Sequence, residues 1–174
     1  VDPVSVDPAL LPQRQLEPAS RGEFCHDVLR RLFGRLPRRD GAVWLAELGA
    51  PELEAALDAA VAEAAEEVEK RRPPYPALWA LQRQQMRDDI RRYLLAAAGE
   101  DRLRTRCLHF ELGFGVGAAP VEGLDPASRA EPATMRTPAG EVRLRGRIDR
   151  VDRVEVQGNE GLLVVDYKTG RLPG

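Results

Sequence analysis

Two acidic residues and a lysine lie at the ends of two candidate strands in the last third of the chain. Asp149 belongs to the segment 146–152, and Asp166 and Lys168 follow the apolar run 162–165. Because residues two apart on a strand point to the same side of a sheet, Asp166 and Lys168 are expected to share one side. Carboxylates and a lysine that converge at strand ends can hold a divalent metal ion against a phosphodiester and activate water.

The spacing also permits Asp149 to join this group. If the two strands pair so that Asp149 lies opposite Asp166, the connection is centred between Gln157 and Gly158, where turn-forming residues begin. Two carboxylates a few ångströms apart repel each other, and one normally takes up a proton unless a cation lies between them. Oxygen ligands suit Mg²⁺ or Mn²⁺, and Lys168 would stabilise negative charge on a phosphoryl group under attack. The predicted cofactor is therefore Mg²⁺ or Mn²⁺.

The alternative is a solvent-exposed hairpin whose charged residues form ordinary salt bridges. Asp-x-Lys is a common tripeptide, and by itself it favours this alternative. The apolar run before Asp166 favours a functional site, since charged residues that end a buried strand are less often ordinary surface residues. Because the run 162–165 is continuously apolar, it predicts a central strand covered on both faces.

Three helices are predicted before the strands. Apolar residues recur at helical spacing in 21–36, between Pro51 and Pro73, and in 76–98. The residues expected to face inward are Val28, Leu29, Leu32, Phe33, Leu36, Leu53, Leu57, Ala60, Val61, Ala64, Val68, Trp79, Met86, Ile90, Tyr93, Leu94 and Ala97. Residues 1–19 are rich in proline and lack periodicity, so we expect an extended arm there.

From about residue 103 the apolar period changes to two. Strict alternation predicts that Phe110 faces one side of a strand while Cys107 and Glu111 face the other. A long loop is expected over 117–140 and a single strand over 141–156. The order of elements predicts an α/β fold whose N-terminal half is helical.

Composition excludes several classes of protein. The formal charge of −2 gives no global attraction to nucleic acid, so any attraction to phosphate must be local. Cys25 and Cys107 are too few for a disulfide scaffold or a four-cysteine metal site, and a reducing cytoplasm is the expected compartment. No apolar run approaches the roughly 18 residues that span a membrane, so no membrane partner is expected.

Four short motifs occur in a fixed order. They are Gly-x-x-x-His (Gly22 to His26), Glu-x-x-Phe (Glu111 to Phe114), Gly-Arg-Ile-Asp-Arg-Val-Asp (146–152) and Asp-Tyr-Lys-Thr-Gly (166–170). Each motif alone is weak, but together they resemble the nuclease domain of the PD-(D/E)XK superfamily, in its RecB and AddB branch. The resemblance covers about residues 22–170 and implies a restriction-endonuclease-like core, in which a central mixed β-sheet is flanked by helices.

The resemblance also implies roles for individual residues. The implied metal ligands are His26, Asp149, Asp166 and the carbonyl oxygen of Tyr167. Lys168 is the implied catalytic lysine, next to the catalytic carboxylates of Asp149 and Asp166. Glu111 is implied to face the active site, as a catalytic acid or an outer-sphere contact of the metal.

Several of these residues also have a plainer interpretation. His26 lies at helical spacing from apolar residues, so it is also interpretable as a histidine at the edge of the core. Glu111 is equally interpretable as a strand-edge carboxylate paired with an arginine. Arg147 and Arg150 belong to a locally basic strand and are candidate DNA-binding residues, with a solvated sheet face as the alternative.

Two functions follow from the resemblance, and a different enzyme of the same fold, such as a restriction-type endonuclease or a CRISPR-associated exonuclease, is a third alternative. The first is a Mg²⁺- or Mn²⁺-dependent deoxyribonuclease, an exonuclease that works with helicase–nuclease subunits or domains in DNA repair and recombination. The second is a catalytically silent DNA-binding or scaffolding module of such a complex. This branch usually continues into a helix with Gln-x-x-x-Tyr, which is absent before Gly174, so a nuclease domain over 20–174 is expected to be incomplete at its C-terminus.

Overall fold

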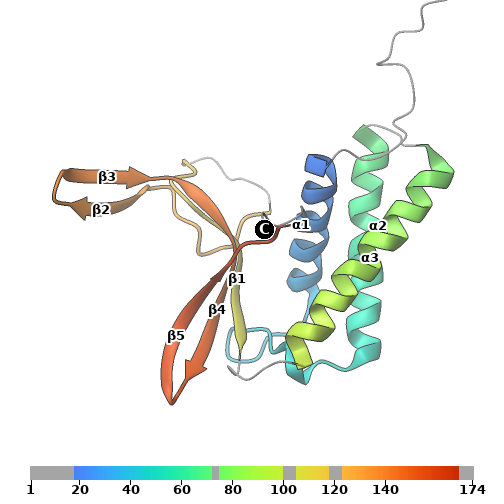
Figure 1. The fold of residues 1–174 in the computed structure, drawn as a ribbon, viewed down its shortest axis with the longest axis horizontal. Helices are drawn as coiled ribbons and strands as arrows, with labels where there is room; N and C mark the ends of the chain where they lie inside the picture. The colour runs from blue at the N-terminus through green and yellow to red at the C-terminus, as the bar shows by residue number, and fades with distance from the viewer. Residues whose placement is uncertain (1–17, 72–74, 100–104, 118–122, 169–174) are drawn as a thin grey trace, which may run out of the picture.

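The first half of the protein is helical and the second half is built of strands, as Figure 1 shows. The structure, a computed structural model, describes residues 18–71, 75–99, 105–117 and 123–168. The helices are α1 (Pro18–Arg35), α2 (Ala50–Arg71) and α3 (Pro76–Gly99), with a 3-10 turn η2 (Leu45–Glu47) after α1. Of the arm predicted over 1–19, residues 1–17 lie outside the described residues, and 18–19 already belong to α1.

The three helices pack together through the apolar stripes that the sequence predicts. Leu32 and Phe33 of α1, Leu57 of α2 and Leu94 of α3 are completely buried in one hydrophobic cluster. Residues three and four apart lie on the same face of a helix, which is why each stripe joins the cluster. None of the described helices is long and apolar enough to cross a membrane.

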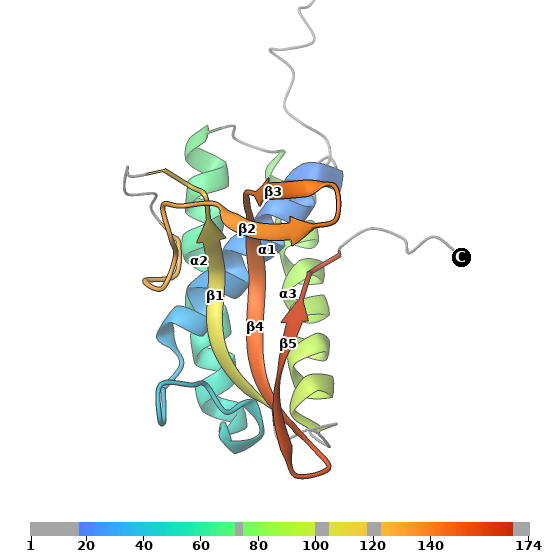
Figure 2. The same ribbon diagram turned by 90° about the vertical axis from the view of Figure 1, so that its left-hand side faces the viewer.

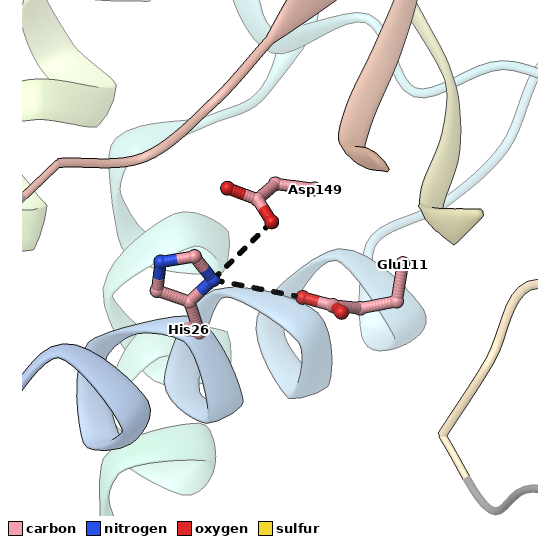
Figure 3. Close-up of side chains that lie close together, drawn as sticks. All are labelled: His26, Glu111 and Asp149. Carbon is pink, nitrogen blue, oxygen red and sulfur yellow. Dashed lines mark ion pairs between the residues drawn. The ribbon is translucent and has the colours of Figure 1, made fainter. Parts of the chain in front are cut away.

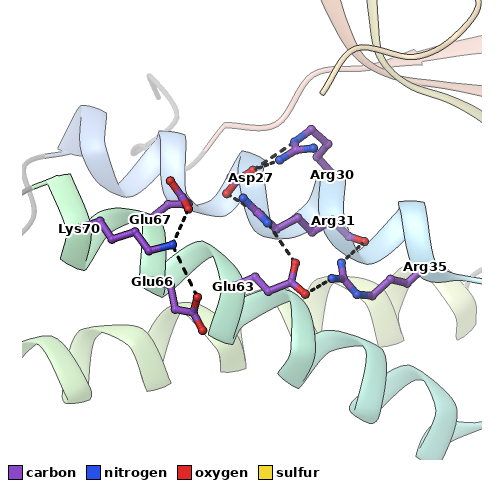
Figure 4. A network of polar contacts seen from close by, with 8 residues as sticks. All are labelled: Asp27, Arg30, Arg31, Arg35, Glu63, Glu66, Glu67 and Lys70. Carbon is purple, nitrogen blue, oxygen red and sulfur yellow. Dashed lines mark hydrogen bonds and ion pairs between the residues drawn. The ribbon is translucent and has the colours of Figure 1, made fainter. Parts of the chain in front are cut away.

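Ion pairs cover the outer surface of the α1–α2 contact, as Figure 4 shows. Glu63 of α2 accepts hydrogen bonds from Arg31, at 3.0 Å, and from Arg35 of α1. Asp27 also accepts from Arg31, at 2.8 Å, so that one guanidinium links both helices to the network. Exposed pairs of this kind contribute only about 0–1 kcal/mol each, so the buried cluster carries the packing.

The main sheet has the strand order β1–β4–β5, formed by β1 (Arg106–Phe114), β4 (Gly146–Val156) and β5 (Asn159–Val165). Both pairs of strands are antiparallel, and helix α1 packs against β1. The expected α/β fold with a helical N-terminal half is confirmed. Within the described residues both strand pairs of the main sheet are antiparallel, and the parallel pairing found there is an isolated bridge between Phe114 of β1 and Arg129.

The predicted register of the last hairpin is confirmed. Val156 pairs with Asn159 and Arg150 pairs with Val165, so the turn is centred between Gln157 and Gly158. The observed register ends at Arg150 and Val165; extended by one residue, it would bring Asp166, just beyond β5, opposite Asp149.

The expectation that 162–165 forms a central, doubly covered strand is wrong. β5 lies at the edge of the sheet, and Leu162 and Val164 are 70% and 60% exposed. A continuous apolar run is consistent with a buried strand, but the run does not specify which neighbours pair with the strand or cover it.

Strict alternation along β1 is also wrong. The β1–β4 register shifts between Cys107 and His109, so the strand has a bulge at Leu108. Because the extra residue reverses the alternation, Cys107 and Phe110 both join the helical core.

The loop expected over 117–140 contains a strand, and the single strand expected over 141–156 is two. β2 (Ala133–Thr137) pairs with β3 (Gly140–Leu144) in a separate two-stranded sheet, and Arg145 separates β3 from β4. This hairpin projects from the main sheet on the side away from the helices, as Figure 1 shows. Figure 2 shows it crossing the end of the sheet where β1 ends and β4 begins.

Gly115 anchors this hairpin to β1. Its N–H donates to the carbonyl of Glu131 at 2.8 Å, and its φ of 68° lies in the left-handed region. A Cβ at this position would lie 2.6 Å from Cγ of Arg145 and 3.2 Å from Cα of Pro132. Both the backbone angle and the close approach therefore require glycine.

Replacement of this glycine is expected to destabilise the protein. Gly115→Ala should lower the free energy of unfolding by about 1–2 kcal/mol, the usual cost of a left-handed backbone for an L-residue, measured by urea unfolding. Gly34→Ala is the matched control, because a Cβ on Gly34 of α1 meets nothing within 4 Å and alanine favours a helix. Equal effects of the two substitutions would contradict the described anchor.

Candidate metal centre

Three potential metal ligands from different elements converge at one end of the main sheet, as Figure 3 shows. Glu111 lies near the end of β1, Asp149 lies near the start of β4, and His26 lies on α1. The pairing of Phe110 with Arg150 and of Leu112 with Ile148 places Glu111 opposite Asp149. One donor atom from each of the three residues lies within 4.8 Å of the other two.

The imidazole of His26 lies between the carboxylates and the backbone of Tyr167. Its Nδ1 is 3.5 Å from Oδ1 of Asp149 and 3.9 Å from Oε1 of Glu111. On the other edge of the ring, Nε2–H donates to the carbonyl oxygen of Tyr167 at 3.1 Å. The N–H of Tyr167 in turn donates to Oδ2 of Asp149 at 2.7 Å, so the backbone of Tyr167 is fixed between the two side chains.

The charges of this cluster favour a cation. Glu111 and Asp149 are only 4% and 9% exposed, so their negative charges are poorly screened by water. The neighbouring Glu111 carboxylate raises the pKa of His26 above its ordinary value; burial opposes this, while Asp149 and the Tyr167 carbonyl add to it. The site therefore already attracts positive charge onto the imidazole.

Glu111 has two unusual features. Its φ of 56° lies in the left-handed region, which non-glycine residues seldom adopt. Its Oε2 lies 2.7 Å from Nε of Arg147, but the N–H does not point at it, and this buried oxygen accepts no hydrogen bond among the described residues. Strained backbone and an unsatisfied buried oxygen often occur together at functional sites.

Asp166 and Lys168 form a second group at the exit of β5. Their side chains point to the same side, as expected, and Nζ of Lys168 lies 2.7 Å from Oδ2 of Asp166. Both side chains are exposed, and Asp166 is not among the ligands that converge with His26. The ion pair with Asp166 raises the pKa of Lys168, and Asp149 adds to the effect, so the field of the buried carboxylates reaches this ammonium.

The two arginines that were expected to contact DNA lie in different environments. Arg147 is more than half exposed and lies at the entrance to the cluster, next to Glu111. Arg150 is 5% exposed, and its guanidinium donates to Asp152 and to the hydroxyl groups of Tyr93 and Tyr167. The expected DNA contact of Arg150 is therefore corrected to a buried structural role.

Two supporting residues had no assigned role in the sequence-based prediction. Asp152 is completely buried against Arg150, and Tyr93 of α3 makes an edge-to-face contact with the ring of Tyr167. The alternation that places Asp152 on the same side as Arg150 is visible in the sequence. The partner of Tyr93 is not, because it depends on how α3 packs on the sheet.

Comparisons with known proteins identify the superfamily of the chain. The profile of the PD-(D/E)XK nuclease superfamily matches residues 5–174, so the chain belongs to that superfamily. The chain is also 29% identical, over 163 residues, to a subunit of the ATP-dependent helicase/deoxyribonuclease of Latilactobacillus sakei subsp. sakei (strain 23K). That alignment covers 92% of this chain, and the chain spans 13% of the length of the relative.

The donor set fits a hard divalent cation. The two carboxylates offer the oxygen ligands that Mg²⁺ and Mn²⁺ prefer, and Nδ1 of His26 faces them, whereas the Tyr167 carbonyl accepts a hydrogen bond on the other edge of the ring. The unsatisfied Oε2 of Glu111 adds an acceptor that a cation or its water shell would use. The arrangement can therefore hold a metal ion at the end of the sheet, beside an exposed lysine.

Proposed function

We propose that this chain is a metal-dependent deoxyribonuclease domain that hydrolyses phosphodiester bonds of DNA. The observation that carries the proposal is the convergence of His26, Glu111 and Asp149 within 4.8 Å, next to the Tyr167 carbonyl. Membership of a nuclease superfamily supports the same conclusion.

We assign a separate role to each residue of the site. Asp149, His26 and the Tyr167 carbonyl would hold Mg²⁺ or Mn²⁺, and Glu111 would contact the ion directly or through water. We keep Asp166 as a further ligand because the β4–β5 register, extended by one residue beyond Val165, would bring it opposite Asp149. The ion, when bound, would polarise a phosphoryl oxygen and lower the pKa of water.

Lys168 would act through its charge. Its pKa is raised, so the ammonium stays protonated at neutral pH. A fixed positive charge beside the phosphate stabilises the negative charge that develops during hydrolysis. The exposure of the side chain lets a polymeric substrate reach it.

The wider setting is also proposed. The relative is named as a helicase/deoxyribonuclease subunit. We infer that this chain acts with helicase–nuclease subunits or domains as an exonuclease in DNA repair or recombination. Both cysteines are buried thiols, which suits a reducing cytoplasm.

Cleavage of linear DNA tests the proposal. The wild-type chain should cut in Mg²⁺ or Mn²⁺ and stop on chelation, and Asp166→Ala and Lys168→Ala should each lose at least about 100-fold in rate, since an electrostatic catalytic group contributes that much. Both side chains are exposed, so thermal unfolding should change little. Equal cleavage by all three proteins would reject the site. A wild type that binds DNA but never cuts it would instead identify the catalytically silent module.

A further inference from the structure

The β2–β3 hairpin and the residues that flank it carry an excess of positive charge beside the candidate metal centre. Between residues 129 and 147 the sequence contains five arginines and two glutamates, within a chain whose net charge is −2. All five arginines are exposed: Arg129, Arg136, Arg143, Arg145 and Arg147. This segment is therefore locally basic although the chain as a whole is not.

The arginines of the helices are different. Every arginine of α1 and of α3 forms an ion pair with an acidic residue of the helical layer. In the part of the chain that the structure describes, Arg136 and Arg145 form no ion pair, and the partner of Arg143 is Glu141 of the same hairpin, at 3.4 Å. The arginines of α1 and α3 are therefore neutralised locally, whereas Arg136 and Arg145 are available to a partner and Arg143 is paired only within the hairpin.

The hairpin presents this charge on one face. The pairing of Thr134 with Arg143 and of Arg136 with Glu141 places both arginines on the same side of the two strands. The opposite side carries apolar residues, namely Ala133, Met135, Val142 and Leu144. The first face therefore carries two arginines against one glutamate, Glu141, and its excess of positive charge suits a polyanion.

The position of the hairpin connects this face to the site. The chain passes from Arg143 through Arg145 to Arg147, with one residue between successive arginines, and Arg147 contacts Glu111 of the cluster. The stem of Arg145 lies across Gly115, and Arg129 donates its backbone N–H to the carbonyl of Gly113, so the base of the hairpin is fixed to β1. The hairpin lies at the end of the sheet where β1 ends and β4 begins, which is the end that carries Glu111 and Asp149 (Figure 2).

We propose that the β2–β3 hairpin is an arm that binds the phosphate backbone of DNA through Arg136 and Arg143 and guides it past Arg145 and Arg147 to the metal centre. This inference rests on the proposed function, because DNA is the substrate named there. Contacts to phosphate are independent of base sequence, and each one releases condensed counterions. The arm would therefore contribute salt-dependent affinity without sequence specificity.

Binding of fluorescently labelled DNA at several NaCl concentrations, without divalent metal, tests the arm. Arg136→Ala/Arg143→Ala should weaken binding roughly tenfold per arginine at about 0.1 M salt, and the slope of log K against log salt should become shallower by about 1 per arginine. The variant Arg136→Lys/Arg143→Lys keeps the charges and should retain most of the affinity. Both positions are exposed on the hairpin, so the double variants should fold normally.

Two control variants test whether the loss of affinity is specific to the arginines of the hairpin. Arg83→Ala/Arg92→Ala removes two arginines of α3 that are paired with Glu69 and Asp89, and it should leave DNA affinity unchanged. Met135→Thr/Val142→Thr alters the apolar face and should also leave it unchanged. Unchanged affinity of the hairpin arginine variant, loss of affinity only in the apolar-face variant, or no DNA binding by the wild type would each overturn the arm.

The outcome is separable from the proposed function. If no cleavage is found but DNA binding depends on Arg136 and Arg143, the arm stands and the nuclease proposal fails. If cleavage is found and DNA affinity does not depend on these arginines, the arm fails and the nuclease proposal stands.

Discussion

Asp149→Asn is expected to abolish most DNA cleavage while leaving the protein folded. The substitution removes the charge of a carboxylate that lies 3.5 Å from His26 and opposite Glu111. Loss of a residue that only orients a metal ligand typically costs 10–100-fold in affinity or activity, so loss of a ligand should cost more than about 100-fold. Steady-state cleavage of linear DNA and titration with Mn²⁺ would measure the two effects.

The folded state should tolerate this change because asparagine keeps the hydrogen bond. The side-chain oxygen of the new asparagine can still accept from the N–H of Tyr167, as Oδ2 of Asp149 does at 2.7 Å. The free energy of unfolding should therefore change by no more than about 1 kcal/mol. Asp125→Asn is a matched control, since Asp125 is also buried but binds His109 and the backbone N–H groups of Phe110 and Ala127. Activity that survives in Asp149→Asn would contradict its assignment as a ligand.

Arg150→Met is expected to produce the largest loss of stability. Its guanidinium lies 2.9 Å from the carboxylate of Asp152, which is completely buried, and it is surrounded by the rings of Phe33, Tyr93 and Tyr167 at 5.6–5.9 Å. Methionine fills similar space but leaves the carboxylate without its partner. Breaking a buried pair in this way costs about 3–5 kcal/mol, measured by urea unfolding.

The loss of stability caused by Arg150→Met should grow with pH. Burial raises the pKa of Asp152 above its ordinary value, although Arg150 pulls it down. In Arg150→Met the lowering is lost, so the pKa rises further and the folded state holds the proton to a higher pH than the unfolded state. The contribution of Asp152 to stability in this variant is therefore fully present below its unfolded pKa and is lost as the pH rises through its folded pKa.

A second substitution separates charge from packing. In Arg150→Met/Asp152→Val both charges are replaced by apolar groups, which is often neutral or stabilising at a buried pair. The double variant should recover much of the stability and lose the additional pH dependence. If it is as unstable as Arg150→Met at every pH, lost packing around the three rings explains the effect rather than the unpaired charge.

The helices and the last hairpin could be predicted from the sequence because their signals are local. The apolar stripe that ends in Leu32 and Phe33 has helical spacing, and the turn at Gln157 and Gly158 sets the register of two strands. The exposure of β5 could not be predicted, since an apolar run does not specify its neighbours. The bulge in β1 could not be predicted from a period-two pattern either, because one extra residue reverses the facing of every later position.

The residues of the site that belong to short motifs could be predicted from the sequence. The motifs indicated His26, Glu111 and Asp149, and the structure brings them together. The contacts of two other charged groups depend on tertiary packing and could not be predicted. Arg150 belongs to a basic stretch in the sequence, but α3 and the ring of Tyr167 enclose it. Asp166 pairs with the exposed Lys168 and is not among the ligands that converge with His26.

Anomalous scattering from crystals grown with Mn²⁺ would locate the metal ion itself. We predict a peak at the end of the sheet, with the carboxylate of Asp149 and the carbonyl oxygen of Tyr167 at metal–oxygen distances of about 2.0–2.2 Å. His26 or Glu111 should lie in the same ligand shell, and the peak should be absent in Asp149→Asn. A fully loaded crystal whose only peak lies elsewhere, with His26 still bonded to Tyr167 as before, would contradict the metal centre.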